Sequence, residues 1–216
     1  MAGYRGFPAT RDSRKIPRMS ALPQPRFSPA DYLAWEVDQP VKHEYVCGEV
    51  FAMAGASDAH VTVSLNVAGA LRDHLRGTGC RTYIADMKLK AADNAYFYPD
   101  VFVTCSAADA KRSDIKEEAV LVVEVLSPST AAYDRGVKFA YYRGMASLQE
   151  YVLIDPERVS VDVFRRGADG LWVLHPFGPG DTVELASVGL RLPMQRVYED
   201  ITDAEGAPLV MGSGAG

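Results

Sequence analysis

Three charged residues in the middle of the chain, Asp100, Glu124 and Lys138, have the types and spacing that a hydrolytic site requires. Asp100 and Glu124 each lie in an apolar, β-branched run, at 98–103 and 120–126 respectively. A buried charge without a partner is costly, so something must compensate these two carboxylates. A shared divalent cation such as Mg²⁺ or Mn²⁺ would do so, and Lys138 on the following element would supply the positive group that a hydrolytic site needs.

Two strands must bring the carboxylates together. The apolar runs predict strands over 96–104 and 119–126, and the second should be central in its sheet because both of its faces are apolar apart from Glu124. A polar, charged loop over 107–118 joins them. If the strands pair across that loop, Asp100 and Glu124 lie side by side.

A helix over 134–145 would carry Lys138, with Asp134 one turn earlier to hold its ammonium group. The order of elements predicts an α+β, α/β-like fold, with a central mixed sheet flanked by helices and extra antiparallel strands near the C-terminus. The other expected elements are a helix opened by Ser28 and ended before Pro40, a hairpin over 43–53 turning at Cys47-Gly48, a helix over 59–76 capped by Ser57 or Asp58, strands over 80–91, 148–154, 159–165, 171–175 and 182–185, and a short helix from Pro193.

Composition favours one globular domain between two tails. The chain has 216 residues, 48% hydrophobic and 24% charged, and no apolar run is long enough to span a bilayer. We expect residues 1–26 to be a disordered basic tail, 27–202 the folded domain and 203–216 a flexible tail. Met19 is a second candidate for the natural start. Because 1–26 lacks the apolar segment of a secretory signal, we expect a cytoplasmic protein without membrane contact.

Charge is divided unevenly between the first tail and the rest. Residues 1–26 carry six basic residues against Asp12, which is +5, so the net charge of -5 leaves -10 for 27–216. An acidic body is awkward for a nucleic-acid binder, since phosphate contacts dominate such affinity. Bound cations or a local basic rim would have to offset it.

The number and spacing of the cysteines predict neither a disulfide framework nor a zinc site. Cys47, Cys80 and Cys105 are odd in number and contain no Cys-x-x-Cys pair. We therefore expect three reduced, mostly buried thiols, and neither a disulfide framework nor a zinc site.

Short segments around these residues resemble one known family. In chain order they are Glu44-Tyr45 with Gly48-Glu49, the run MAGAS at 53–57 with His60, Tyr98-Pro99-Asp100, the run EVLSPST at 124–130 with Asp134 and Lys138, and Glu150-Tyr151-Val152. Over 27–198 the chain is similar to the Uma2 family (DUF820) of putative restriction endonucleases, in the PD-(D/E)xK nuclease superfamily. The resemblance implies a restriction-endonuclease-like core, a Mg²⁺- or Mn²⁺-dependent endonuclease that cuts DNA, and a homodimer, for which the apolar hairpin at 50–53 would supply a contact.

The resemblance also implies roles for single residues. Asp100 and Glu124 would ligate the metal, and Glu44 would complete the acidic cluster as an early glutamate does in this superfamily. The superfamily's lysine lies two residues after the acid, where this chain has Leu126. The resemblance implies that the lysine has moved to the next helix, as Lys138, where it would position water or stabilise the phosphorane.

Each assignment has a structural alternative. Asp100 could cap a turn, and Glu124 could form an ion pair within the sheet. Lys138 could form a surface pair with Asp134, and Glu44 could be an ordinary hairpin residue. His60 could simply lie beside the helix cap Ser57 without a catalytic role. For the whole protein, the alternatives are a catalytically degenerate nuclease fold that acts as an interaction or regulatory module, and a hydrolase of smaller phosphoesters. A serine hydrolase is a poor fit because Ser57 lacks the glycine two residues after it that a nucleophile elbow requires, and no phosphate-binding loop or dinucleotide fingerprint is present.

Overall fold

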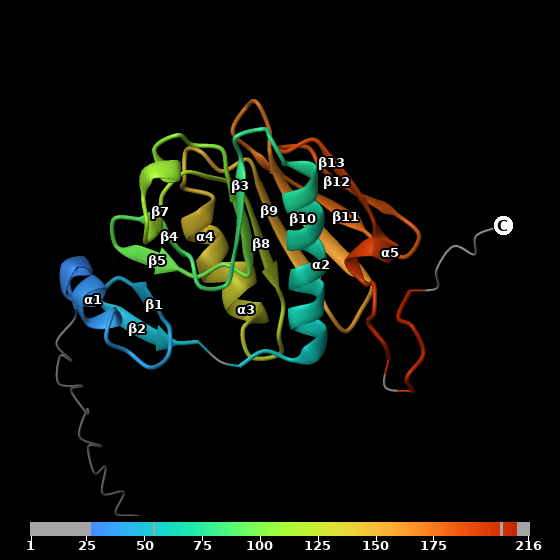
Figure 1. The fold of residues 1–216 in the computed structure, drawn as a ribbon, viewed down its shortest axis with the longest axis horizontal. Helices are drawn as coiled ribbons and strands as arrows, with labels where there is room; N and C mark the ends of the chain where they lie inside the picture. The colour runs from blue at the N-terminus through green and yellow to red at the C-terminus, as the bar shows by residue number, and fades with distance from the viewer. Residues whose placement is uncertain (1–26, 54, 204, 211–216) are drawn as a thin grey trace, which may run out of the picture.

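The computed structural model describes residues 27–53, 55–203 and 205–210, and most of its strands form two sheets (Figure 1). The first sheet contains β1 (His43–Val46), β2 (Glu49–Ala52), β4 (Lys88–Ala92), β5 (Ala95–Phe97) and β7 (Ile115–Lys116), in the order β2-β1-β5-β4-β7. The second contains β3 (Arg81–Ile84), β6 (Val101–Thr104), β8 (Ala119–Val125), β9 (Glu150–Asp155), β10 (Ser160–Arg166) and β11 (Trp172–Phe177), in the order β11-β10-β9-β8-β6-β3. A separate pair is formed by β12 (Thr182–Leu185) and β13 (Leu190–Pro193).

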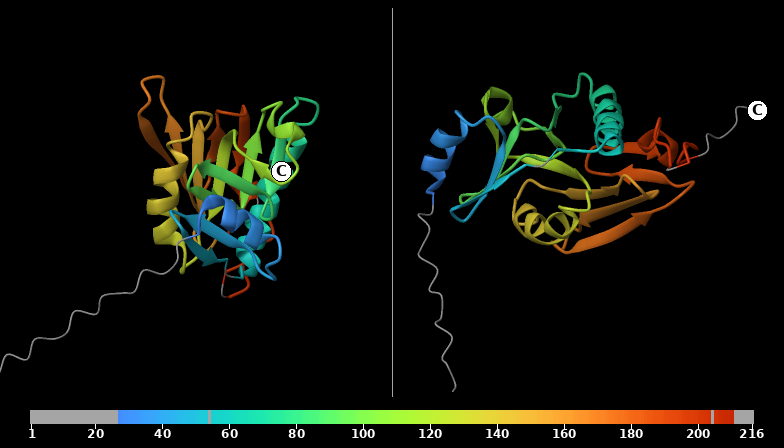
Figure 2. Two further views of the ribbon diagram at one scale, coloured as in Figure 1. Left: turned by 90° about the vertical axis from the view of Figure 1, so that its left-hand side faces the viewer. Right: turned by 90° about the horizontal axis from the view of Figure 1, so that it is seen from below.

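Helices cover both faces of the six-stranded sheet. On one face lies α2 (Asp58–His74), and on the other lies a helical segment made of α3 (Ala131–Tyr133), the π-helical turn η2 (Asp134–Lys138) and α4 (Phe139–Tyr142), as Figure 2 shows. This segment connects β8 to its parallel neighbour β9, while the other strand pairs of the sheet are antiparallel. The expected mixed sheet flanked by helices, with β8 in its interior and antiparallel strands added towards the C-terminus, is confirmed.

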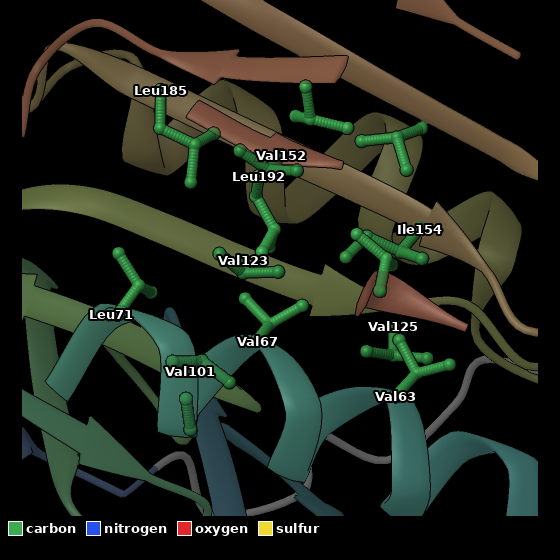
Figure 3. Packing of buried hydrophobic residues seen from close by; sticks show 14 of the residues in the cluster. Val63, Val67, Leu71, Val101, Val123, Val125, Val152, Ile154, Leu185 and Leu192 are labelled. Atoms are coloured by element: carbon green, nitrogen blue, oxygen red, sulfur yellow. The ribbon is translucent and has the colours of Figure 1, made fainter. Parts of the chain in front are cut away.

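The main core lies between α2 and the sheet (Figure 3). Val63, Val67 and Leu71 recur at helical spacing on one side of α2, and each is 2% exposed or less. They pack on odd-numbered residues of β6 and β8, such as Val101 and Val123. The even-numbered residues of β6 and β8 therefore face α4, and Glu124 is one of them.

The hairpin and the start of α2 follow the sequence prediction. Cys47 and Gly48 have φ of 50° and 94°, which suits a two-residue turn between antiparallel strands. The Ser57 side chain caps α2 by accepting a hydrogen bond from the His60 backbone N–H at 3.3 Å. The remaining helices are α1 (Pro29–Glu36), the 3₁₀ turn η1 (Asp109–Lys111) and α5 (Met194–Val197).

Two expected strands are each divided between the sheets, which corrects the sequence prediction. The segment 80–91 forms β3 in one sheet and β4 in the other, and the segment 96–104 is divided in the same way into β5 and β6. The first break contains Ala85, with φ of 41°, and the second contains Pro99, which has no N–H for a ladder. Within each of these two segments the chain passes from one sheet to the other, and Asp100 lies at the second of these crossings.

Three smaller expectations also change. The helix expected over 134–145 begins at Ala131 and ends at Tyr142, and the loop expected over 107–118 contains η1 and β7. The strand β13 was not predicted, since its four residues between a turn and α5 give little alternation.

The expectation of three reduced, buried cysteines is wrong. Cys80 and Cys105 form a disulfide, and Cys47 is free and exposed. The register explains the pairing: Arg81 lies opposite Thr104 at the end of β3 and β6, so the next residues outward meet directly. Sequence spacing could not reveal this, because the two cysteines are 25 residues apart.

The predicted tails are largely outside the described residues, namely 1–26 and 211–216. Among the described helices, none is long and apolar enough to cross a membrane.

Candidate active site

A pocket of about 630 Å³ opens at the junction of the two sheets. Its polar wall contains all six residues singled out from the sequence, which come from five different segments: Glu44 on β1, His60 on α2, Asp100 before β6, Glu124 on β8, and Asp134 and Lys138 on η2. These residues span 95 positions of the chain, so it is the fold that gathers them.

Lys138 is the centre of the polar wall. Its Nζ lies 2.8 Å from Glu44 Oε1, 3.2 Å from Glu124 Oε1 and 3.3 Å from Asp134 Oδ1. All four side chains are 8% exposed or less. The alternative of a solvent-facing pair between Lys138 and Asp134 therefore does not describe this site.

Asp134 and Lys138 are the two ends of the π-helical turn η2. Turns of this kind are frequent at functional sites. The two residues are four apart and contact each other, and Lys138 also contacts the carboxylates of the neighbouring strands. One turn later, the Tyr142 O–H donates to Glu124 Oε1 at 3.0 Å.

Asp100 lies at the edge of the same pocket with a partner of its own. The β6–β8 register pairs Val101 with Val123, so Asp100 stands opposite Glu124 one step further on. Asp100 Oδ2 accepts a hydrogen bond from the Val125 backbone N–H at 2.7 Å, and Oδ1 lies 2.9 Å from His60 Nε2. The strands therefore do place the two predicted carboxylates side by side.

Burial and charge oppose each other in this cluster. Burial raises the pKa of Glu44 and raises that of Glu124 well above its ordinary value, although Lys138 acts in the opposite direction on both. Burial alone would lower the pKa of Lys138, but the three carboxylates around it raise that pKa well above its usual range. Burial also opposes the charge of His60, whose pKa is nevertheless raised by Asp100.

The charges of the cluster suit a further cation. Glu44, Asp100, Glu124 and Asp134 line one pocket in which Lys138 is the only lysine. Even with His60 protonated beside Asp100, four carboxylates against two cationic side chains leave excess negative charge in a mostly buried space, which is unfavourable unless a proton or a metal ion compensates it.

The ligand set is small. Among the described parts of the chain, no group of three or more His, Cys, Asp or Glu residues is arranged to hold a metal ion. The two carboxylates at opposite positions of neighbouring strands, Asp100 and Glu124, remain as candidates. This suits Mg²⁺, which is usually held by one or two carboxylates together with water and substrate phosphate. The residues therefore fit a divalent cation that also depends on its substrate for ligands.

Sequence reasoning missed three groups in this site. Tyr142 donates to Glu124, and the backbone N–H groups of Tyr98 and Val125 bond to Glu44 and Asp100. The position of Tyr142, four residues after Lys138 on one helix, was a usable signal. Backbone donors leave no signal in a sequence.

Comparisons with known proteins agree with this geometry. A model of the Uma2 family, described as "Putative restriction endonuclease", matches residues 29–195. The uncharacterized protein slr1290 of Synechocystis sp. is 37% identical over 187 residues, which cover 86% of this chain and 98% of that protein. The uncharacterized protein sll1609 of the same organism is 36% identical over 150 residues, 67% of this chain and 84% of that protein.

A solved structure is similar in fold. The crystal structure of a putative nuclease belonging to DUF820 from Anabaena variabilis superposes with a TM-score of 0.68, at 16% identity, over 80% of this chain and 97% of that one. At this identity the likeness concerns the fold, and it confirms the predicted fold class. The match over residues 29–195 establishes the family: this chain belongs to the Uma2 family.

Proposed function

We propose that this protein is a metal-dependent nuclease that hydrolyses phosphodiester bonds in DNA. The observation that carries the proposal is the convergence of three carboxylates on one ammonium group, with Asp100 as a fourth carboxylate in the same open pocket. Family membership supports it, since the family is described by a nuclease activity. The similar fold of the Anabaena protein, itself called a putative nuclease, is consistent with it.

Asp100 and Glu124 would hold Mg²⁺ or Mn²⁺ from two neighbouring strands. When bound, such an ion lowers the pKa of a water molecule and offsets the charge that develops on the phosphate. The Val125 N–H fixes one oxygen of Asp100 by a hydrogen bond of 2.7 Å, so this carboxylate is oriented before any ligand arrives.

Lys138 would act as a fixed cation. Because its pKa is raised well above the usual range, it keeps its proton and cannot accept one from water. Its role would be to donate a hydrogen bond to the attacking water or to a phosphoryl oxygen. Glu44, whose pKa is raised by burial, is better suited to accept the proton of the water, because a general base works best with a pKa closer to neutral pH.

The test is plasmid nicking by the purified protein in Mn²⁺ or Mg²⁺. We expect nicking by the native chain, and a loss of about 100-fold or more in Asp100→Asn and Glu124→Gln, which keep the side-chain shapes but remove the charges. Asp93→Asn is the matched control, because Asp93 is 99% exposed and lies outside the pocket.

Two results would count against the proposal. Equal nicking by the native protein and both variants would assign the activity to a contaminant. Absence of nicking together with absence of calorimetric Mn²⁺ binding would favour the degenerate scaffold that acts as an interaction module.

A further inference from the structure

The wall of the pocket opposite the carboxylates is apolar and open to solvent. Phe51, Val61, Leu65 and Ile84 line it, and they are 41%, 55%, 62% and 52% exposed. Large apolar side chains that gather around one opening, rather than scatter over the surface, usually mark a binding site.

Three of the four apolar residues lie next to a polar site residue in the sheet or along the chain. Phe51 is the direct cross-strand partner of Glu44 in the hairpin, so both side chains lie on the same face. Ile84 is followed by Ala85, whose backbone N–H donates to the Asp100 carbonyl at 3.2 Å. Val61 follows His60 on α2. The acidic centre and the apolar wall therefore belong to one binding site.

Tyr133 connects the two walls. Its ring centroid lies 5.9 Å from Lys138 Nζ and 5.9 Å from the centroid of the Phe51 ring. A single aromatic ring thus separates the ammonium group from an exposed phenyl face. A ligand with an anionic group joined to a flat apolar group would contact both.

The charges of the pocket do not suit a DNA duplex. A duplex binder neutralises phosphates of both strands with lysine and arginine. Among the lining residues the basic side chains are Lys138 and His60, and Lys138 is already surrounded by three carboxylates. In a duplex, moreover, the faces of the bases are stacked on each other and could not reach Phe51. An unpaired strand exposes those faces, and stacking on an aromatic side chain stabilises its binding.

We infer that the pocket takes a nucleotide of an unpaired strand, with its phosphate at the carboxylates and its base against Phe51, Leu65 and Ile84. This rests on the proposed nuclease activity and narrows its substrate to single-stranded nucleic acid or to frayed and unpaired positions. The volume of about 630 Å³ is within the range of pockets that enclose small organic ligands.

The test measures binding separately from cleavage. The probe is a short fluorescein-labelled oligothymidylate, alone or annealed to its complement, titrated with the full chain in EDTA and in Ca²⁺ and followed by anisotropy. We expect the single strand to bind about tenfold more tightly than the duplex, and Phe51→Ala to weaken single-strand binding about tenfold. Phe51→Leu keeps an apolar side chain without a ring, so its affinity for the single strand should lie between those of the native protein and Phe51→Ala. Leu171→Ala is the control, because Leu171 is 64% exposed and lies in the turn between β10 and β11.

Other outcomes would overturn the inference. Equal or tighter binding of the duplex would do so, as would unchanged binding by Phe51→Ala. A native dimer in sedimentation that Phe51→Ala converts to monomers would assign the apolar wall to a second copy of the chain, in line with the predicted homodimer contact. Failure to nick any DNA in Mn²⁺ would remove the proposed nuclease activity, while the anisotropy result would still decide whether an unpaired base binds.

Discussion

Two buried acidic centres in this protein differ in how far hydrogen-bond donors and cations compensate their negative charge. Asp109, in the loop before β8, is fully buried, and its oxygens accept hydrogen bonds from Arg112, the Thr104 hydroxyl and the backbone N–H groups of Glu117 and Glu118, at 2.7 to 3.0 Å. Burial would raise the pKa of Asp109, but these donors lower it. Four groups donate hydrogen bonds to this one carboxylate, so its negative charge is compensated within the protein.

The candidate active site has the opposite balance. Glu124 shares the single ammonium of Lys138 with Glu44 and Asp134, and its other donor is the Tyr142 hydroxyl. Its pKa is raised well above the ordinary value because burial dominates. The comparison separates a carboxylate that stabilises the fold from carboxylates that are kept short of positive charge, as a site awaiting a cation requires.

The largest effect should come from removing the satisfied carboxylate. Asp109→Ala removes the acceptor of two backbone N–H groups and a hydroxyl and one of the two carboxylate partners of Arg112, and we expect a loss of about 3 to 5 kcal/mol in the free energy of unfolding. Urea titration followed by circular dichroism measures it. Nicking per folded molecule should not change, whereas a parallel loss of specific activity would place Asp109 in the site after all.

The second-largest effect should be stabilisation by Mn²⁺, which should bind at the candidate active site and not at Asp109. A ligand that binds only the folded state at 100 times its dissociation constant stabilises by about 2.7 kcal/mol. We expect Mn²⁺ to raise the melting temperature of the native protein and of Asp93→Asn, but not that of Asp100→Asn or Glu124→Gln. An equal rise in all four proteins would indicate binding elsewhere on this acidic chain.

The residues singled out from the sequence line one pocket, whereas two of the expected strands are divided between the sheets. Asp100 and Glu124 stood out because charge is rare within apolar runs, and that signal needs no knowledge of topology. The runs 80–91 and 96–104 also predicted extended structure correctly. Their division between two sheets depends on Ala85 and Pro99 at the crossings, and local alternation cannot reveal which sheet a strand joins.

Long-range geometry accounts for the rest of what the sequence did not predict. The π-helical turn over Asp134–Lys138 has no separate sequence signature, although the contact between these two residues matches their spacing of four. The pairing of Cys80 with Cys105 follows from the register of β3 and β6. Resemblance to the Uma2 family supplied Lys138 as a candidate, which its surroundings of acidic and helical residues would not have done alone.

The raised pKa of Glu124 predicts a pH dependence opposite to that of Asp109. A carboxyl whose folded pKa is raised favours the folded state below its unfolded pKa of 4.5, and that advantage is lost as the pH rises through the folded pKa. Glu124→Gln carries no such group, so its free energy of unfolding should improve relative to that of the native protein as the pH rises from 4.5 to 8. Urea midpoints across that range measure it, and a parallel pair of curves would show that Glu124 does not titrate differently in the two states.

The smallest expected effect concerns His60. Its Nε2 lies 2.9 Å from Asp100 Oδ1, and Asp100 raises its pKa above 6.5 despite burial. A raised histidine pKa means that the pair stabilises the folded state fully below pH 6.5 and loses that contribution as the pH rises through the folded pKa. In His60→Gln this pH-dependent part, about 1 kcal/mol, should be missing, while the Ser57 cap of α2 should persist because it bonds to the backbone of residue 60.

Urea midpoints of the native protein and His60→Gln between pH 6 and 9 measure this difference, which should be greatest at the acidic end and shrink towards the alkaline end. Other groups near the pocket titrate in both proteins and cancel in the comparison. A difference that stays constant with pH would mean that His60 is neutral throughout and serves Asp100 only as a hydrogen-bond donor. In that case the positive charge available to the four carboxylates would come from Lys138 alone, and the case for an added cation would become stronger.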